Sequence, residues 1–324
     1  MQQRERVHLT RNTERADTST AAAAGVSWYR ERRFNRFFYR ISLAIGGRLS
    51  RTVNHLGARL VARMLHWLLP QSIATIRRNL APVLRLPQEA KQAKAAAKRL
   101  LANFFSYQID FLKACHLFPK STAFLDDIIA FGPKELAPVR ALLAKGKGII
   151  LVTGHFGGWE IGGLTLCRHN LPVTLVSYRE PKGVEELKKL LRTRTGIQTI
   201  TIGRRRFQAI RILRALKANE IVAVHMDRPV TKNVQPARLF GKEATFSKDA
   251  VTLARITGAP MLPCFITMDV NTKRYGALFG NPMYVDKHQE EAAMHTLINL
   301  YKDMLVRYHE QWYNFYPFFK AERC

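Results

Sequence analysis

The feature that most constrains the fold is an alternation of short apolar runs with helical stretches after about residue 148. The apolar runs have the length and β-branched content of buried strands. Strands are predicted at 148–153, 171–178, 197–202, 221–227 and 261–270, with a sixth within 275–285. Helices are predicted at 206–220, 247–260 and 290–312. Strands separated by helices predict an α/β fold, with a mainly parallel central sheet flanked by helices.

The first part of the chain has a different character. Residues 1–27 are polar and charged and predict a disordered tail, and 28–120 predict an N-terminal helical, membrane-associating region. Residues 121–324 are then the α/β catalytic domain. The longest uncharged stretch near the N-terminus, 64–76, is too short to span a bilayer and contains Pro70. Basic amphipathic helices lying at a membrane surface are therefore expected, the alternative being helices that pack their apolar face on this protein.

The charge of the chain indicates an anionic partner. It has 52 Lys and Arg against 24 Asp and Glu, a net charge of +28. Nucleic acid, an anionic membrane and an acidic protein all fit such a charge. No helix-turn-helix, zinc-finger or RNA-recognition signature is present, which argues against nucleic acid. The four cysteines lack zinc-site spacing, so no metal is expected.

The stretch GHFGGWE (154–160) carries the candidate chemistry. It falls between a predicted strand and a predicted helix, where open α/β sheets bind their ligands. His155 and Glu160 can meet only if His155 lies in the turn and Glu160 in the first helical turn. Gly157 and Gly158 permit such a turn, and their N–H groups are candidates for holding a phosphate or an oxyanion. A paired imidazole and carboxylate form a general base, although a lone histidine here can also be structural.

Two hydrolase mechanisms are excluded by missing motifs. A serine hydrolase would need G-x-S-x-G between strand and helix, and that position holds GHFGG. A zinc hydrolase would need H-E-x-x-H or a similar ligand pair, which is also absent.

GHFGGWE resembles the H-x4-D/E motif of glycerolipid-type acyltransferases, and it is most similar to the bacterial lipid A biosynthesis acyltransferase family. Four later blocks resemble the same family in the same order. They are SYREP (177–181), VHMDRP (224–229), LFGKEATFSKDAVTLARITGAPMLPCFI (239–266) and HEQWYNFYPFF (309–319). Unlike many lipid A enzymes, this chain has two glycines within the histidine motif and at best a short N-terminal anchor.

The resemblance implies transfer of a fatty acyl chain from a thioester to a hydroxyl of a membrane lipid or glycolipid. His155 would remove the acceptor proton and Glu160 would orient His155. Arg179 would bind phosphate or stabilise charge, and Asp227 and Arg228 would shape a substrate pocket. No cofactor is implied beyond the thioester of acyl carrier protein or coenzyme A, and the basic surface favours the acidic carrier protein.

The resemblance also places the protein peripherally on the cytoplasmic face of a bacterial inner membrane. Lipid A precursors, lysophospholipids, amino-acid lipids and other glycolipids all stay open as acceptors. The alternative function is a non-catalytic protein that binds anionic lipid or nucleic acid.

Overall fold

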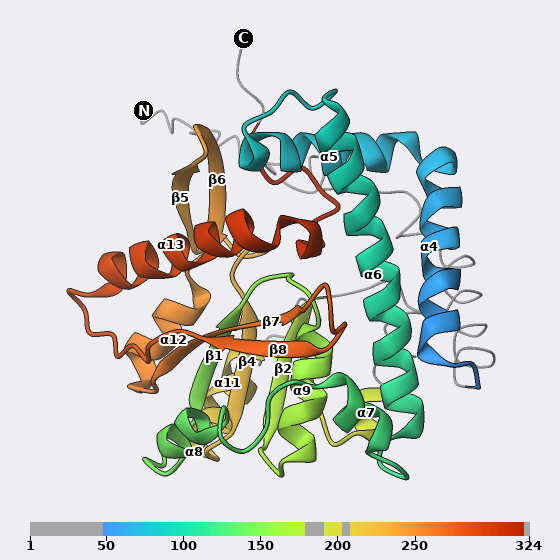
Figure 1. Cartoon of the computed structure of the whole chain (residues 1–324). Coiled ribbons are helices and arrows are strands. Elements are labelled where there is room, and N and C mark those ends of the chain that lie inside the picture. The colour runs from blue at the N-terminus through green and yellow to red at the C-terminus, as the bar shows by residue number, and fades with distance from the viewer. Residues whose placement is uncertain (1–47, 179–190, 203–207, 321–324) are drawn as a thin grey trace, which may run out of the picture.

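A six-stranded sheet lies at the centre of the computed structural model, which describes residues 48–178, 191–202 and 208–320. The strand order is β3-β2-β4-β1-β7-β8 (Figure 1). The strands are β1 (Ile149–Thr153), β2 (Val173–Tyr178), β3 (Gln198–Ile202), β4 (Ile221–His225), β7 (Met261–Met268) and β8 (Tyr275–Phe279). All neighbours pair in parallel except β7 and β8, which are antiparallel. The predicted α/β class is confirmed, and the sixth predicted strand is β8.

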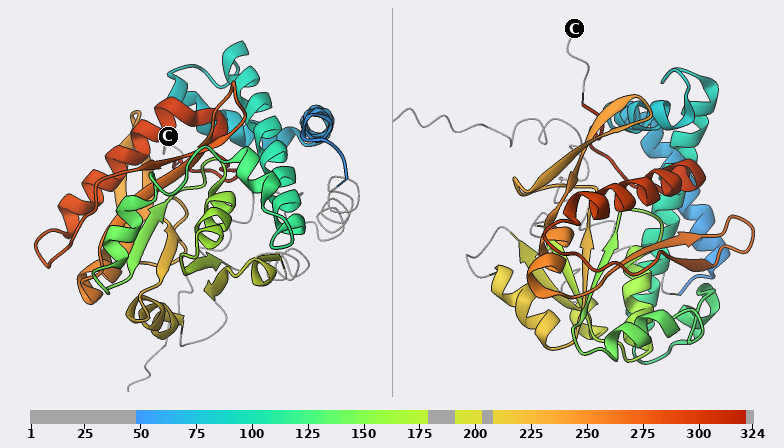
Figure 2. Two further views of the ribbon diagram at one scale, coloured as in Figure 1. Left: turned by 60° about the horizontal axis from the view of Figure 1, so that its bottom comes forward. Right: turned by 90° about the vertical axis from the view of Figure 1, so that its left-hand side faces the viewer.

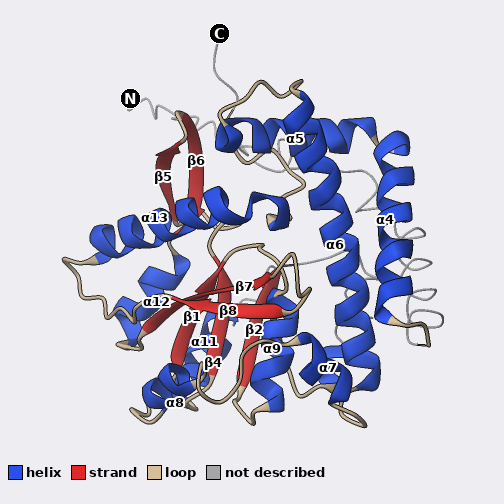
Figure 3. Ribbon diagram, viewed as in Figure 1, coloured by secondary structure: helices blue, strands red, loops and turns tan. Residues whose placement is uncertain are grey.

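Helices cover both faces of the sheet, which is why its inner strands are mostly apolar. Every residue of β1 and β7 is buried. The covering helices are α9 (Trp159–Arg168), α11 (Gln208–Lys217), α12 (Asp249–Thr257) and α13 (Glu290–Tyr308), with the shorter α7 (Ala123–Ile128) and α8 (Ala137–Leu143) (Figure 3). The chain runs from β1 to β2 in one direction across the sheet, and from β3 to β4 and on to β7 in the other. Right-handed crossovers therefore place α9 on one face and α11 and α12 on the opposite face (Figure 2).

The sequence reading missed an antiparallel hairpin between β4 and α12. It consists of β5 (Val234–Leu239) and β6 (Lys242–Ser247), which form a separate two-stranded sheet. Phe240 and Gly241 turn the chain with φ values of 51° and 78°, as expected for a two-residue hairpin turn. Pro236 and the charged residues interrupt the apolar alternation, so this segment carried no clear strand pattern.

The predicted N-terminal helices are present in the described part of the region. They are α4 (Arg51–Leu68), α5 (Pro70–Leu84) and α6 (Lys91–Leu117), and Pro70 opens α5 directly after α4 ends. Buried residues of these helices belong to the same hydrophobic cluster as the strands, so the core is continuous across residue 120. Residues 1–47, including the expected tail, lie outside the described residues. Within the described ranges, no helix has the length and apolar character needed to cross a bilayer.

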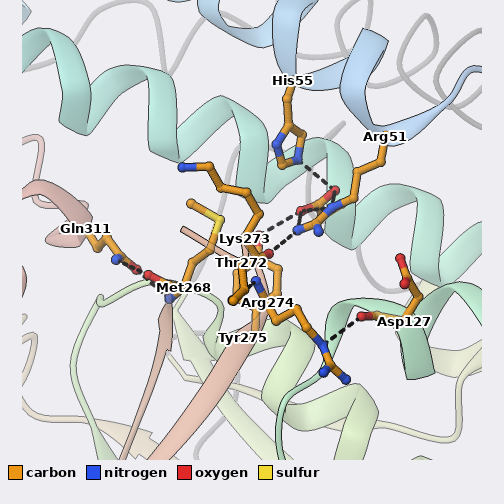
Figure 4. A network of polar contacts seen from close by, with 10 residues as sticks. Arg51, His55, Asp127, Met268, Thr272, Lys273, Arg274, Tyr275 and Gln311 are labelled. Atoms are coloured by element: carbon orange, nitrogen blue, oxygen red, sulfur yellow. Dashed lines mark hydrogen bonds and ion pairs between the residues drawn. The ribbon is translucent and has the colours of Figure 1, made fainter. Parts of the chain in front are cut away.

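A buried carboxylate attaches α4 to the rest of the molecule. Asp110 of α6, whose side chain is 1% exposed, accepts hydrogen bonds from Arg51 Nη2 (2.8 Å) and the Tyr275 hydroxyl (3.0 Å). His55 Nε2 lies 3.0 Å from the same carboxylate. Arg51 also donates to the carbonyl of Lys273 in the β7–β8 turn, at 2.5 Å (Figure 4). This network fixes which face of α4 is turned inward.

Candidate active site

The candidate site lies at the carboxyl ends of two adjacent parallel strands, β1 and β4. After these strands the chain continues to opposite faces of the sheet. The chain leaves β1 toward α9 and leaves β4 toward the hairpin and α12. Thr153 and His225 are paired at the ends of these strands, and two residues further along come His155 and Asp227. Such a switch point is where doubly wound sheets leave a crevice for ligands. The strand order thus brings together two side chains that are 72 residues apart in the sequence.

Asp227 holds His155 through both carboxylate oxygens. Oδ1 lies 2.7 Å from His155 Nδ1, and Oδ2 accepts the His155 backbone N–H at 2.8 Å. The Tyr301 hydroxyl donates to Oδ2 at 2.9 Å, and the Tyr316 hydroxyl donates to the Asp227 carbonyl at 2.5 Å. Asp227 has no exposed side-chain surface, whereas the His155 side chain is 22% exposed. The imidazole is therefore anchored on its inner side and reachable from its outer side.

The charge state of this pair determines the chemistry that it can perform. Burial alone would raise the pKa of Asp227, but the charge and hydrogen bonds of His155 outweigh burial and lower it to about 2. An ionised carboxylate only accepts hydrogen bonds, so Nδ1 carries the imidazole proton. In the neutral form of the imidazole the lone pair is then on Nε2, which is not the nitrogen bonded to Asp227. The neutral form of this pair can act as a general base.

The described hydrogen bonds of Glu160 go to Arg192 and Tyr107 and not to His155, so the expected contact between Glu160 and His155 is corrected. Glu160 lies in the first turn of α9 as expected, but its carboxylate points into the core. Glu160 Oε1 accepts from Arg192 Nη2 at 2.5 Å, and Oε2 accepts from the Tyr107 hydroxyl at 2.8 Å. Spacing in the sequence suggested Glu160 as the partner of His155. The carboxylate that is bonded to the imidazole is instead that of Asp227, which follows the neighbouring strand β4.

The expected ligand-binding role of Gly157 and Gly158 is also corrected. The Gly157 N–H donates to the Gln311 carbonyl (2.8 Å), and the Gly158 N–H donates to the Ile266 carbonyl (3.0 Å). Neither N–H is therefore available for a phosphate or an oxyanion. A Cβ on Gly157 would lie 2.2 Å from the Ile266 oxygen, and one on Gly158 would lie 2.6 Å from the Tyr275 ring. These glycines let the turn pack directly against β7 and β8.

We expect Gly157→Ala to destabilise the fold. Gly157 has a φ of 51°, where a β-carbon costs about 1–2 kcal/mol, and the clash with Ile266 adds to this. The loss should be about 2 kcal/mol or more in urea unfolding. Gly163→Ala in α9 is the matched control, because its Cβ would meet only Ile197 Cδ1 at an ordinary 3.6 Å. Equal stabilities of the two variants would contradict this account of the turn.

The C-terminal block closes over the turn. Gln311 Nε2 donates to the Met268 carbonyl (2.7 Å), and Gln311 Oε1 accepts the Met268 N–H (2.8 Å) (Figure 4). The Gln311 side-chain amide thus pairs with the backbone at the end of β7 as a neighbouring strand would. The Tyr313 N–H donates to the His155 carbonyl at 2.8 Å. The block therefore pairs with the backbone that directly follows the histidine.

Comparison with known families identifies one family over most of the chain. The model of the bacterial lipid A biosynthesis acyltransferase family matches residues 31–321, nearly the whole chain. The chain belongs to this family. The match includes the histidine turn, the strand that leads to Asp227 and the C-terminal block.

Two phosphatidylinositol mannoside acyltransferases are more distant relatives. The protein of Mycobacterium tuberculosis strain CDC 1551 / Oshkosh is 25% identical over 190 residues, which cover 58% of this chain and 59% of the relative. The protein of strain ATCC 25618 / H37Rv is 26% identical over 125 residues, covering 38% and 40%. The matches thus span about half of the length of these relatives.

The remaining predicted site residues of this acyltransferase family member differ in how the structure places them. Arg179 lies outside the described residues. Arg228 follows Asp227 and is exposed, with its guanidinium 5.1 Å from the centre of the Tyr316 ring. Arg228 is therefore at the edge of the site. Within the described ranges, no group of three or more His, Cys, Asp or Glu side chains is arranged to hold a metal ion.

Proposed function

We propose that this protein transfers a fatty acyl chain from a thioester to a hydroxyl of a membrane lipid or glycolipid, with His155 as the general base. The observation that carries the proposal is the buried Asp227 carboxylate bonded to His155 Nδ1, which leaves the lone pair of the neutral imidazole on Nε2. The pair lies at the ligand-binding edge of an α/β sheet, in a chain of a lipid acyltransferase family.

The reaction follows from this pair in two proton transfers. His155 Nε2 takes the proton of the acceptor hydroxyl as its oxygen forms a bond to the thioester carbonyl carbon. The carbon–sulfur bond then breaks, and the departing thiolate takes the proton from the His155 imidazolium. Asp227 stabilises the imidazolium between these steps and fixes its orientation. The products are an ester and a free thiol, and the protein returns to its starting state.

We propose a chemical class for the acyl donor and one for the acceptor lipid. The donor is an acyl thioester, with acyl carrier protein favoured over coenzyme A because a chain of net charge +28 attracts an acidic protein. The named substrate of the mycobacterial relatives is phosphatidylinositol mannoside, a phosphate-containing glycolipid, which favours an anionic glycolipid among the open acceptors. Arg228 at the site edge, together with Arg179, is proposed to bind its phosphate.

We also propose that α4 docks the enzyme on the cytoplasmic face of the bacterial inner membrane. The inner face of α4 packs on α6, but its outer face has apolar side chains that are 48–79% exposed. These are Val53, Leu56, Leu60, Met64, Trp67 and Leu68. Arg59 and Arg63 are exposed on the same helix, and each basic residue near an anionic surface contributes about 1 kcal/mol of attraction. An anionic bilayer fits both the apolar and the basic side chains.

Removing apolar anchors from α4 should weaken membrane binding. We expect Leu60→Asp and Trp67→Asp each to lower the affinity for anionic phosphatidylglycerol vesicles about tenfold or more, given the transfer energy of one large apolar side chain. Vesicle co-sedimentation measures this. Ile256→Asp on α12 removes a residue of similar exposure (59%) far from α4 and should leave binding unchanged. An equal loss in the control would contradict the assignment of α4.

The enzymatic proposal is tested by supplying labelled acyl carrier protein and coenzyme A thioesters with a panel of extracted lipids. A labelled lipid product is expected, and its identity names the acceptor. If neither thioester yields a product while the protein binds lipid vesicles, the enzymatic proposal fails and a non-catalytic lipid-binding function replaces it.

A further inference from the structure

A second histidine is stacked on the candidate base. His225 is the last residue of β4 and is paired with Thr153 at the end of β1. The ring centres of His155 and His225 are 4.2 Å apart, and their planes are inclined by 24°. Aromatic rings at this separation and angle are in stacking contact. His225 therefore covers one face of the imidazole whose edge is bonded to Asp227.

Trp159 completes the enclosure of the imidazole. Its ring meets His155 edge-on at 5.4 Å and 74°, and it meets His225 edge-on at 5.7 Å and 88°. The three rings thus contact one another pairwise. A rotation of the His155 ring away from its present plane would break both the stack and the hydrogen bond to Asp227.

His225 stays uncharged in these surroundings. Burial is the largest cause that lowers its pKa, and the charges of His155 and Arg192 lower it further, while Asp227 and Glu160 act in the opposite sense. The result is a pKa of about 3. Its Nε2 is buried without a hydrogen-bond partner in the described structure. A second positive charge beside His155 would oppose proton uptake, and a neutral ring avoids this.

We propose that His225 is a positioning residue: its ring, stacked on His155, holds Nδ1 toward Asp227 and Nε2 toward the acceptor, and its π face stabilises the charged imidazolium. The catalytic role of His225 rests on the proposed acyl transfer, whereas the stacking of His225 on His155 is independent of that proposal. Aromatic faces stabilise cations within about 6 Å of the ring centre, and the stacked imidazole lies well inside that limit.

The test compares His225→Gln, which keeps a polar side chain of similar length, with His225→Phe, which keeps a flat neutral ring. We expect His225→Gln to lower kcat about tenfold or more with little change in KM, since misorientation by about 1 Å can cost 100-fold. The acid limb of its pH profile should move to lower pH by about 0.4–1.5 units, the equivalent of a lost cation–π contact. His225→Phe should retain kcat within about threefold, since it keeps the ring face. Equal kcat values and acid limbs in wild type and His225→Gln would overturn the proposal.

A second readout needs no turnover. In protein labelled on histidine, the ring signals of His155 are identified by their loss in His155→Asn and followed during a pH titration. The titration midpoint should fall in folded His225→Gln and stay near the wild-type value in His225→Phe. Unchanged midpoints in both variants overturn the proposal even if one variant loses activity. If no protein transfers acyl chains but the midpoints separate as expected, the proposed enzymatic function fails while the role of His225 toward His155 is upheld.

Discussion

Asp227→Asn is expected to lower kcat about 10³- to 10⁴-fold while the protein stays folded. The amide keeps the size of the carboxylate but presents N–H donors toward the imidazole. His155 Nδ1 must then accept, so its proton moves to Nε2 and the lone pair that removes the acceptor proton is lost. The negative charge that stabilises the imidazolium is lost as well. Initial rates of labelled acyl transfer measure the effect, with circular dichroism to confirm folding.

Tyr301→Phe is the matched control for this prediction. It removes one hydrogen bond to Asp227 Oδ2 and leaves the contact between Oδ1 and His155 in place. Its loss in kcat should stay within about 100-fold, because a single hydrogen bond to a charged group contributes about 1.5–3 kcal/mol. If Asp227→Asn and Tyr301→Phe lose the same activity, the carboxylate does not control the tautomer of His155.

The same carboxylate has a consequence for stability at low pH. Its pKa falls from 3.8 to about 2 in the folded protein, so its ionised form stabilises the fold fully above about pH 4. That contribution is lost as the pH falls from about 4 to about 2. The stability of Asp227→Asn should therefore depend less on pH in this window than that of wild type.

Glu160→Ala is expected to destabilise the fold by about 3–5 kcal/mol, the range for removing one partner of a buried ion pair. Glu160 and Arg192 have side-chain exposures of 1% and 9%, and the carboxylate also accepts from the buried Tyr107 hydroxyl. Its loss removes the carboxylate that is bonded to the Arg192 guanidinium and leaves a cavity between α6 and α9. Urea unfolding measures the change in the free energy of unfolding.

Glu243→Ala controls for the loss of any ion-pair carboxylate. Glu243 lies 3.3 Å from Lys320, but these side chains are 66% and 57% exposed, so no measurable change in stability is expected. Glu160→Gln separates the structural role of Glu160 from a catalytic one. Where this variant folds, it should keep far more activity than Asp227→Asn. If Glu160→Gln loses more activity than Asp227→Asn, Glu160 rather than Asp227 orients His155.

The fold was largely predictable because its strands are buried on both faces. Such strands form continuous apolar runs, as in β1 and β7, and they stand out in the sequence. The β5–β6 hairpin did not stand out, because its residues are mostly exposed or half-buried and Pro236 interrupts the pattern. The hairpin is recognised from the backbone pairing of β5 with β6 and not from the sequence pattern.

The site was predictable in part. His155 was found because it follows an apolar strand and precedes a glycine-rich turn. The role of Asp227 toward it was not found, since the order of β4 and β1 in the sheet depends on long-range pairing that no local pattern records. The stacking of His225 on His155 has the same origin. Gly157 and Gly158 were noted for their turn, but their close packing on β7 and β8 was invisible in the sequence.

The most direct test of the central claim is transfer of labelled acyl chains from acyl carrier protein thioester to extracted lipids by wild type and His155→Ala. The account predicts a labelled lipid with wild type and a loss of at least about 100-fold in the variant, because a general base contributes about 10²- to 10⁴-fold. Folded His155→Ala that transfers the label at the wild-type rate would contradict it.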